Sequence, residues 1–150
     1  MSGRIAVGVD GSEGARAALA WAVDEARLRD ATVVAVHAWH LPSMMVPGPF
    51  GAAPIVDDET VERVRKAAEE ILDRELAAID ASGVQVEPAV VTGSPASALM
   101  QTADGADLLV VGTRGHGGFS GLVLGSVSQQ VSHHAPCPVV IVPHSAAGDR

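Results

Sequence analysis

Several residue types that support common functions are scarce in this chain of 150 residues. Cys137 is its only cysteine, so no intrachain disulfide can form, which agrees with a reducing compartment. We interpret this thiol as a small apolar residue at the start of a strand. The only lysine, Lys66, lies away from any cluster of glycines. That position excludes the G-x4-G-K-[S/T] loop of many nucleotide-hydrolysing enzymes, whose lysine reaches the terminal phosphates.

Positive charge and aromatic side chains are also scarce. The chain has 10 lysines and arginines against 18 aspartates and glutamates, a formal net charge of −8, and 3% of its residues are aromatic. Proteins that bind nucleic acid usually present a basic surface, so we expect no nucleic-acid partner. No apolar run reaches the roughly 18 residues of a membrane-spanning helix, and no charged-then-apolar leader begins the chain. We therefore expect a cytoplasmic protein that has no contact with a membrane.

Three other kinds of site are excluded by spacing. The six histidines form no H-x3-H pair and have no second cysteine to join them, so we expect no dedicated metal ligands. A dinucleotide-binding dehydrogenase needs G-x-G-x-x-G after its first strand, whereas Asp10-Gly11-Ser12 follows the first strand here. A phospho-accepting receiver domain would end its third strand with aspartate and its fifth with lysine; Thr92 and Pro143 take those places.

Hydrophobic periodicity predicts strands that alternate with helices. Short apolar runs indicate strands at 4–9, 32–39, 84–91, 107–111 and 139–142, and helical spacing indicates helices at 13–29, 58–81, 95–104 and 126–134. Ser12 and Ser94 are expected to cap two of these helices, and Gly83 to end the second. Apolar strands between helices are typical of a parallel sheet covered on both faces. We expect one α/β domain over residues 1–150, with a Rossmann-like three-layer α/β/α architecture and a five-stranded parallel sheet.

Two segments are predicted to lie outside these elements. Residues 41–56 contain four prolines and two glycines, a composition that predicts a long flexible loop. Residues 144–150 are small and polar, and they predict a frayed C-terminal tail.

The segment from Gly112 to Ser126 carries the strongest functional signal. Six glycines lie between Gly112 and Gly125, more than a packed helix or strand needs. Glycine lets a ligand approach the main chain, and successive backbone N–H groups can form a concave site for a phosphate. Gly125 and Ser126 would open the next helix, whose N-terminal N–H groups also favour an anion. Arg114 and His116 could supply positive charge to phosphates; exposed positions without a ligand role are the alternative for both.

Asp10 follows the first strand, at the kind of position where open parallel sheets bind ligands. If the first and fourth strands are neighbours, Asp10 and the glycine-rich segment face one crevice. The carboxylate could then accept hydrogen bonds from a ribose hydroxyl or an adenine amine, or help to hold a divalent metal near phosphates. The alternative is that Asp10 caps the following helix together with Ser12.

The spacing of the glycines resembles the motif of a known family. Gly112-x2-Gly115-x9-Gly125-Ser126 matches the G-2x-G-9x-G-[S/T] motif of the universal stress proteins. The sequences VGVDGS at 7–12 and CPVVIVP at 137–143 are also similar to that family, and the resemblance covers the whole chain in length and element order. It implies a sheet of order 3-2-1-4-5, which places the first and fourth strands side by side, and it implies ATP binding.

The resemblance also assigns roles to residues. The turn after the first strand would contact adenosine, and the backbone of Ala38 would meet adenine, at a position where many relatives have valine. Gly112 and Gly115 would line the path of ribose and phosphate, and the start of the last helix would hold phosphates. The cofactor-binding residues expected in this way are Asp10, Gly11, Ser12, Ala38, Gly112, Arg114, Gly115, His116, Gly125, Ser126 and Val127.

Binding is predicted more strongly than catalysis. No nucleophile elbow and no paired carboxylates are evident in the sequence, so we assign no catalytic residue. We predict a regulator or sensor in the stress response that depends on ATP, bound with Mg²⁺, and that acts on an unidentified protein partner. A slow Mg²⁺-dependent ATPase and a ligand-independent dimeric adaptor with chaperone-like behaviour are the alternatives. The resemblance and an apolar edge strand together predict a homodimer through Val139, Val140, Ile141 and Val142.

Overall fold

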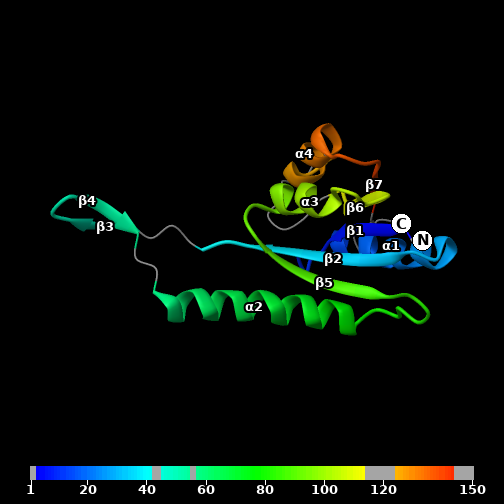
Figure 1. Cartoon of the computed structure of the whole chain (residues 1–150), viewed down its shortest axis with the longest axis horizontal. Coiled ribbons are helices and arrows are strands. Elements are labelled where there is room, and N and C mark those ends of the chain that lie inside the picture. The colour runs from blue at the N-terminus through cyan, green and yellow to red at the C-terminus, as the bar shows by residue number, and fades with distance from the viewer. Residues whose placement is uncertain (1–2, 42–44, 55–56, 114–123, 144–150) are drawn as a thin grey trace, which may run out of the picture.

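Five parallel strands form the central sheet of the computed structural model, which describes residues 3–41, 45–54, 57–113 and 124–143. The strands lie in the order β5-β2-β1-β6-β7, and each neighbouring pair is parallel (Figure 1). Their bounds are Arg4–Gly8 for β1, Thr32–Trp39 for β2, Val86–Thr92 for β5, Leu108–Gly112 for β6 and Val139–Val142 for β7. The expected α/β class and five-stranded parallel sheet are confirmed.

Four helices cover the two faces of this sheet. Helices α1 (Glu13–Arg29) and α2 (Asp58–Ala77) pack on one face, and α3 (Pro95–Ala103) and α4 (Ser126–His134) pack on the other. Figure 1 shows α3 and α4 above the sheet and α2 below it. The arrangement is the three-layer architecture that the alternation of apolar strands and helices predicts.

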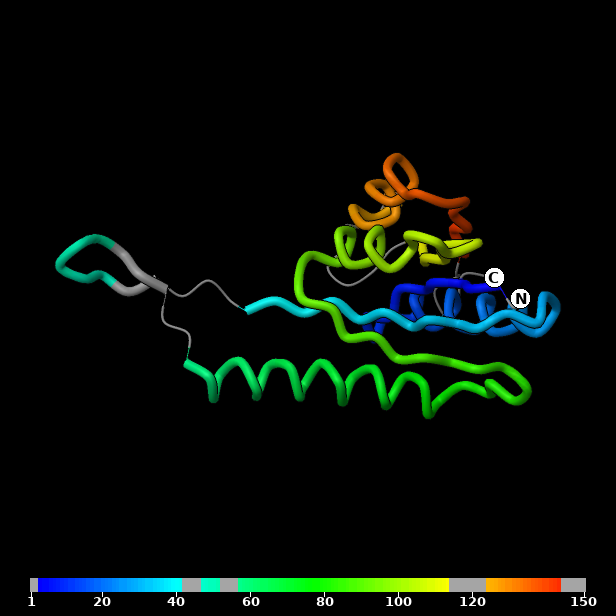
Figure 2. Tube along the Cα trace, in the orientation of Figure 1, coloured from blue at the N-terminus to red at the C-terminus, as the bar shows by residue number. Residues whose placement is uncertain are grey.

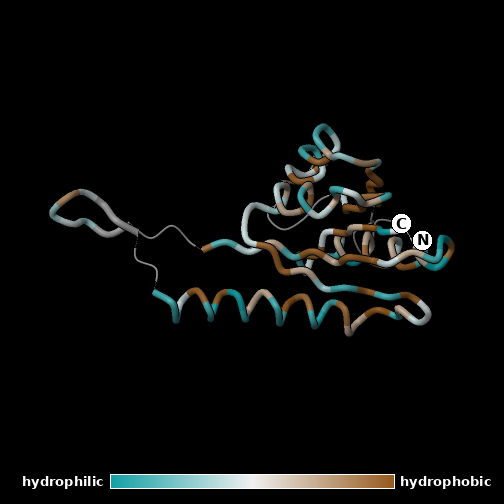
Figure 3. The backbone as a smooth tube through the Cα atoms, viewed as in Figure 1, coloured by the Kyte–Doolittle hydropathy of each residue, from teal (hydrophilic) through white to brown (hydrophobic). Residues whose placement is uncertain are grey.

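Each face has its own apolar core because successive side chains of a strand point to opposite faces. In β1, Ile5 and Val7 pack with Leu19 of α1, whereas Ala6 packs with Leu99 of α3. Figure 3 shows the apolar residues concentrated along the central strands, with polar residues interrupting them along α2. The central strands are thus buried on both sides, which fixes their register.

The strand order agrees with the predicted 3-2-1-4-5 once the strands of the sheet are counted along the chain. The labels differ because two further strands, absent from the prediction, lie between β2 and β5 in the sequence. Crossovers through α1 and α2 carry the chain from β1 outward to β2 and β5. The chain then returns to β6, beside β1, and continues outward to β7.

Residues 45–54 form an antiparallel ribbon, so the prediction of a loop throughout 41–56 is wrong there. Strands β3 (Met45–Gly48) and β4 (Gly51–Pro54) pair with each other in a sheet of their own. Prolines are compatible with this pairing because both strands of a two-stranded ribbon are edge strands. The ribbon projects away from the five-stranded sheet (Figure 2), and Phe50 at its turn is fully exposed. Residues 42–44 and 55–56, and the predicted tail at 144–150, lie outside the described residues.

Capping residues set the starts of three helices. Ser12, Asp57 and Ser94 each accept a hydrogen bond from the backbone N–H three residues later. The predicted caps at Ser12 and Ser94 are therefore confirmed. Helix α2 ends at Ala77, four residues before the predicted 81, and Gly83 adopts a φ of 78° in the turn that leads to β5.

Leu72 provides a test of this packing, because it lies on α2 and is buried in the core between the helix and the sheet. It is 1% exposed, whereas Leu28 on α1 is 84% exposed. We expect Leu72→Ala to lower the free energy of unfolding by about 2–5 kcal/mol, since a buried cavity remains. Leu28→Ala, the matched control, should change it by less than about 0.5 kcal/mol. Urea unfolding measures both, and equal effects would contradict the placement of α2.

Candidate functional site

The carboxyl ends of β1 and β6 meet at the point where the chain connections diverge. The connection after β1 leads to β2 on one side, and the connection after β6 leads to β7 on the other. Open α/β sheets bind ligands at such a switch point, in a crevice between the two connections, and we call this region of the chain the crevice. Val7 of β1 is in register with Val110 of β6, so Asp10 and Thr113 follow their strands at the same edge of the sheet.

The turn after β1 is organised by the Asp10 carboxylate. Its Oδ1 accepts hydrogen bonds from the backbone N–H of Ser12, at 2.9 Å, and from the Ser12 hydroxyl. Gly11 takes a φ of 83°, a conformation that side chains disfavour. Ser12 Oγ in turn accepts from the N–H of Ala15 at 3.2 Å and caps α1. Asp10 therefore supports the helix cap, which is one of the two roles that the sequence suggested for it. Its contact with a ligand stays a prediction.

Gly112 has a packing role in the structure. A Cβ atom at this position would lie 2.6 Å from the carbonyl oxygen of Gly14, in the first turn of α1. The backbone of α1 therefore reaches the end of β6 only because Gly112 carries no side chain. The glycine brings the two sides of the crevice together, whether or not it also lines a ligand path.

Hydrogen bonds to the Thr113 carbonyl join the end of β6 to the start of α4. The Thr113 oxygen accepts from the N–H of Gly125 at 2.6 Å and from the Ser128 hydroxyl at 2.9 Å. Ser128 Oγ also lies 3.0 Å from the Gly125 oxygen. Gly125 is the N-cap of α4, and Ser126 and Val127 begin the helix, where backbone N–H groups lack partners within the helix.

Ser128 was not among the residues selected from the sequence. A second hydroxyl two residues after Ser126 was the only available signal, and helix periodicity does not say that it faces inward. Its bond to Thr113 spans 15 residues, so only the fold brings the two groups together.

The remaining predicted residues divide into two groups. Ala38 lies near the end of β2, in register with Val91 of β5, and is half-buried against the core under α3. Next to it, His37 Nδ1 lies 2.7 Å from the Val9 oxygen and ties the end of β2 to the end of β1. Arg114, Gly115 and His116 lie outside the described residues.

An ion pair between an exposed arginine and a buried glutamate braces the helix that starts at the crevice. Arg16, in the second turn of α1, donates from Nε to Glu75 Oε2 at 2.9 Å and from Nη2 to Oε1 at 3.0 Å. Glu75 lies on α2 and is 5% exposed. The hydrogen bonds from Arg16 lower the pKa of Glu75 below its usual range, against the opposing effect of burial. The pair joins α1 to α2 beside the turn that holds Asp10.

Cys137 is half-buried and packs against the core under α3 and α4. Burial, followed by the charge of Asp107, raises the pKa of the Cys137 thiol above its usual range. The thiolate is therefore disfavoured, as expected for a residue that acts as a small apolar side chain.

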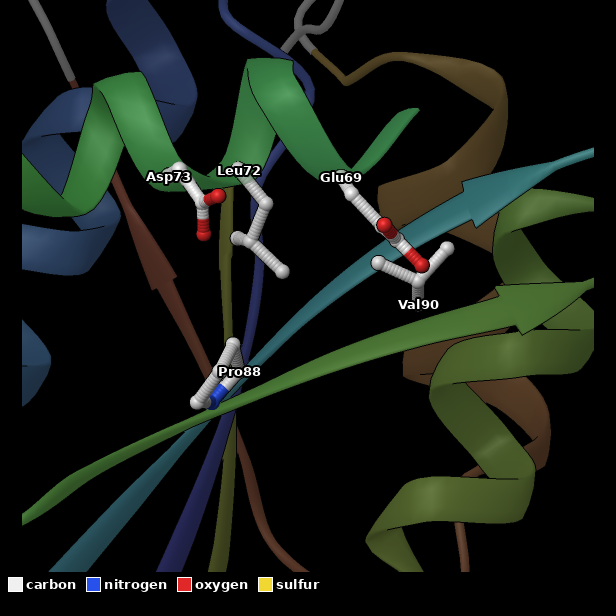
Figure 4. A pocket seen from close by; sticks show the side chains of 5 residues that line it. All are labelled: Glu69, Leu72, Asp73, Pro88 and Val90. Carbon is white, nitrogen blue, oxygen red and sulfur yellow. The ribbon is translucent and has the colours of Figure 1, made fainter. Parts of the chain in front are cut away.

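A groove of about 380 Å³ lies elsewhere, between α2 and β5. Figure 4 shows Glu69, Leu72 and Asp73 pointing from α2 toward the strands, with Pro88 and Val90 of β5 on the opposite wall. Of the predicted site residues that the structure describes, none lines this groove. Across the described ranges, no group of three histidine, cysteine or acidic residues is arranged to hold a metal ion. None of the helices in those ranges is long and apolar enough to span a membrane.

Comparison with known proteins identifies the family to which the chain is related. A family model described as the universal stress protein family matches residues 1–143. A universal stress protein of Mycobacterium tuberculosis is 35% identical over 143 residues, which cover 94% of this chain and 45% of that protein. The chain thus spans about half the length of the mycobacterial relatives it matches.

Two solved structures are similar over nearly the whole chain. One is a universal stress protein in complex with cAMP, with a TM-score of 0.62 and 29% identity, covering 96% of this chain and 98% of that chain. The other is a universal stress protein of Archaeoglobus fulgidus in complex with dAMP, with a TM-score of 0.56 and 26% identity, covering 93% and 97%.

The Arg16–Glu75 pair predicts a specific acid sensitivity. Because the folded state holds the pKa of Glu75 below its usual value, the pair stabilises the fold above about pH 4.3, the ordinary glutamate pKa, and this contribution is lost as the pH falls below it. We expect Glu75→Gln to lower the free energy of unfolding at pH 7, and the difference from wild type to shrink between pH 4.5 and about pH 3.

Glu62→Gln is the matched control, because Glu62 pairs with Arg65 on the exposed face of the same helix. It should change stability little at either pH. Urea unfolding across this pH range measures the effect, and a pH-independent difference for Glu75→Gln would contradict the argument.

Proposed function

The chain belongs to the universal stress protein family, and on this premise we propose that it binds an adenine nucleotide in the crevice between the ends of β1 and β6. The observation that carries the proposal is the pairing of these two strands, which brings the Asp10 turn and the start of α4 to one edge of the sheet. Two similar structures were solved with cAMP and dAMP, both adenine nucleotides.

We propose ATP with Mg²⁺ as the physiological ligand. The Asp10 turn would receive the ribose, and the backbone of Ala38 would meet adenine. Gly112 and Gly115 would line the path of ribose and phosphate. The amides at the start of α4, from Gly125 to Val127, would hold the phosphates, because a helix N-terminus favours negative charge. Arg114 and His116 would add positive charge near the phosphates.

Regulation is the function that fits this chemistry. In the described part of the crevice the functional groups are main-chain amides and a carboxylate engaged in a turn, a set suited to binding. We propose that the protein acts in the cytoplasm as a nucleotide-dependent sensor of stress, with ATP shifting it toward one state that a protein partner reads. This requires ATP to prefer that state.

Asp10→Asn tests the site, with Asp80→Asn as its matched control. Asp80 forms the same kind of turn, accepting from the N–H of Ser82 at 3.0 Å and from its hydroxyl, between α2 and β5. We expect Asp10→Asn to weaken AMP and ATP·Mg²⁺ binding about tenfold or more, because a charged hydrogen-bond acceptor is lost, and Asp80→Asn to leave binding unchanged. Isothermal titration calorimetry measures the affinities.

Three results would contradict the proposal in different ways. If wild type does not bind ATP at millimolar concentration with Mg²⁺, the ligand-independent adaptor is the hypothesis that remains. Equal affinities for Asp10→Asn and wild type would show that the nucleotide does not bind at Asp10. ATP turnover faster than about one per second, within the common enzyme range, would show that the protein is an ATPase and not a sensor.

We also propose that β7 mediates a homodimer. It is an edge strand of the sheet, and all four of its residues are half-buried in the single chain. A bare apolar edge pairs readily with another chain, and a charge on it blocks pairing. Sedimentation velocity at micromolar concentration should show a dimer for wild type and for Leu28→Lys, and a folded monomer for Ile141→Lys. A wild-type monomer would refute the proposal.

A further inference from the structure

Ser128 is unusual among the polar side chains of the molecule. Among the described residues, Ser128 and Glu75 are the buried polar or charged side chains, and Ser128 is 2% exposed. Burial of a hydroxyl costs free energy unless it is hydrogen-bonded. Ser128 meets this requirement at the β6–α4 junction, where its hydroxyl lies 2.9 Å from the Thr113 oxygen and 3.0 Å from the Gly125 oxygen.

Comparison with a second serine on the same helix shows which of the two Ser128 contacts is unusual. The Ser132 hydroxyl donates to the carbonyl of Gln129, three residues earlier, at 2.8 Å, and it is exposed. A bond to the carbonyl three residues back is therefore available to any serine on α4 and needs no special surroundings. What distinguishes Ser128 is a second acceptor within reach of its single proton, the Thr113 carbonyl at the end of another element.

Thr113 connects Ser128 to the nucleotide crevice. Its carbonyl oxygen accepts the Gly125 N–H and the Ser128 hydroxyl, one for each of its lone pairs. These two bonds fix the first turn of α4 against the end of β6. Main-chain amides cannot be re-aimed by a side-chain rotation, so their direction depends on where this turn is held.

We propose that Ser128 is a positioning residue for nucleotide binding, whose hydroxyl holds the Thr113 carbonyl against the first turn of α4 and so aims the amides of Ser126 and Val127 into the crevice. The inference rests on the proposed function. Ser128 itself touches no ligand. Its effect passes through Thr113 and Gly125, both of which flank the segment 114–124 in the sequence.

The test compares four substitutions by AMP titration calorimetry and by thermal melting. Ser128→Ala should weaken AMP binding about fivefold to tenfold, as expected for the loss of one hydrogen bond that organises the site. Ser128→Thr, which keeps the hydroxyl, should bind within about twofold of wild type. Ser132→Ala removes the matching hydroxyl one turn later and should also bind as wild type does.

Val131→Ala separates positioning from stability. Val131 lies on α4, is fully buried in the core under α3 and α4, and makes no bond to the junction. Its truncation should lower the melting temperature at least as much as Ser128→Ala while AMP affinity stays within about twofold of wild type. If Ser128→Ala does not fold, Ser128→Cys preserves the side-chain volume with a much weaker donor and should show the same loss of affinity.

The outcomes distinguish the two proposals. Wild type that fails to bind AMP overturns the proposed function and this inference with it. Wild type that binds, with Ser128→Ala unchanged, overturns the positioning role alone. A Val131→Ala protein that loses as much affinity as Ser128→Ala, or a Ser128→Thr protein that is not rescued, also overturns it, because the effect would then follow stability or packing.

Discussion

The pairing of β1 with β6 is the constraint on which the rest of the structure depends. Because of this pairing, the connection from β1 to β2 and the connection from β6 to β7 start next to each other and run in opposite directions, which defines the crevice. It also brings α1 onto the end of β6, where only glycine is small enough at Gly112 to lie beside Gly14. The apolar alternation of β1 holds this arrangement in register, because a shift by one residue would exchange the two cores.

Most of the fold follows from local patterns in the sequence. The bounds of α1, β2, α4 and β7 match the predicted segments, since apolar periodicity and capping residues are local signals. The ribbon at 45–54 was missed because proline suggests a break, and its compatibility with an edge strand depends on what lies beside it. The end of α2 was placed too late because the apolar stripe continues past Ala77.

The candidate site was only partly accessible from the sequence. Asp10, Gly112 and Gly125 could be selected because glycines and an aspartate after apolar strands are unusual. The contacts between Ser128 and Thr113, and between Arg16 and Glu75, join elements that the sequence does not place side by side. The sequence could not distinguish a glycine needed for a ligand from one needed for packing, and for Gly112 the structure supplies the packing reason.

In the proposed function, backbone amides at the start of α4 hold the phosphates, and this changes which residues matter. A lysine side chain can adjust to its ligand by rotation, whereas a backbone amide points where the surrounding packing directs it. Affinity would then depend on bonds that lie behind the proposed binding surface, such as the Ser128 hydroxyl on Thr113, as much as on groups that touch the nucleotide. On the opposite side of the crevice, the buried Glu75 and its partner Arg16 act in the same way on α1. Each side of the crevice thus has one buried polar side chain that holds a helix start in place, and rigidity of this kind reduces the entropy lost when a ligand binds.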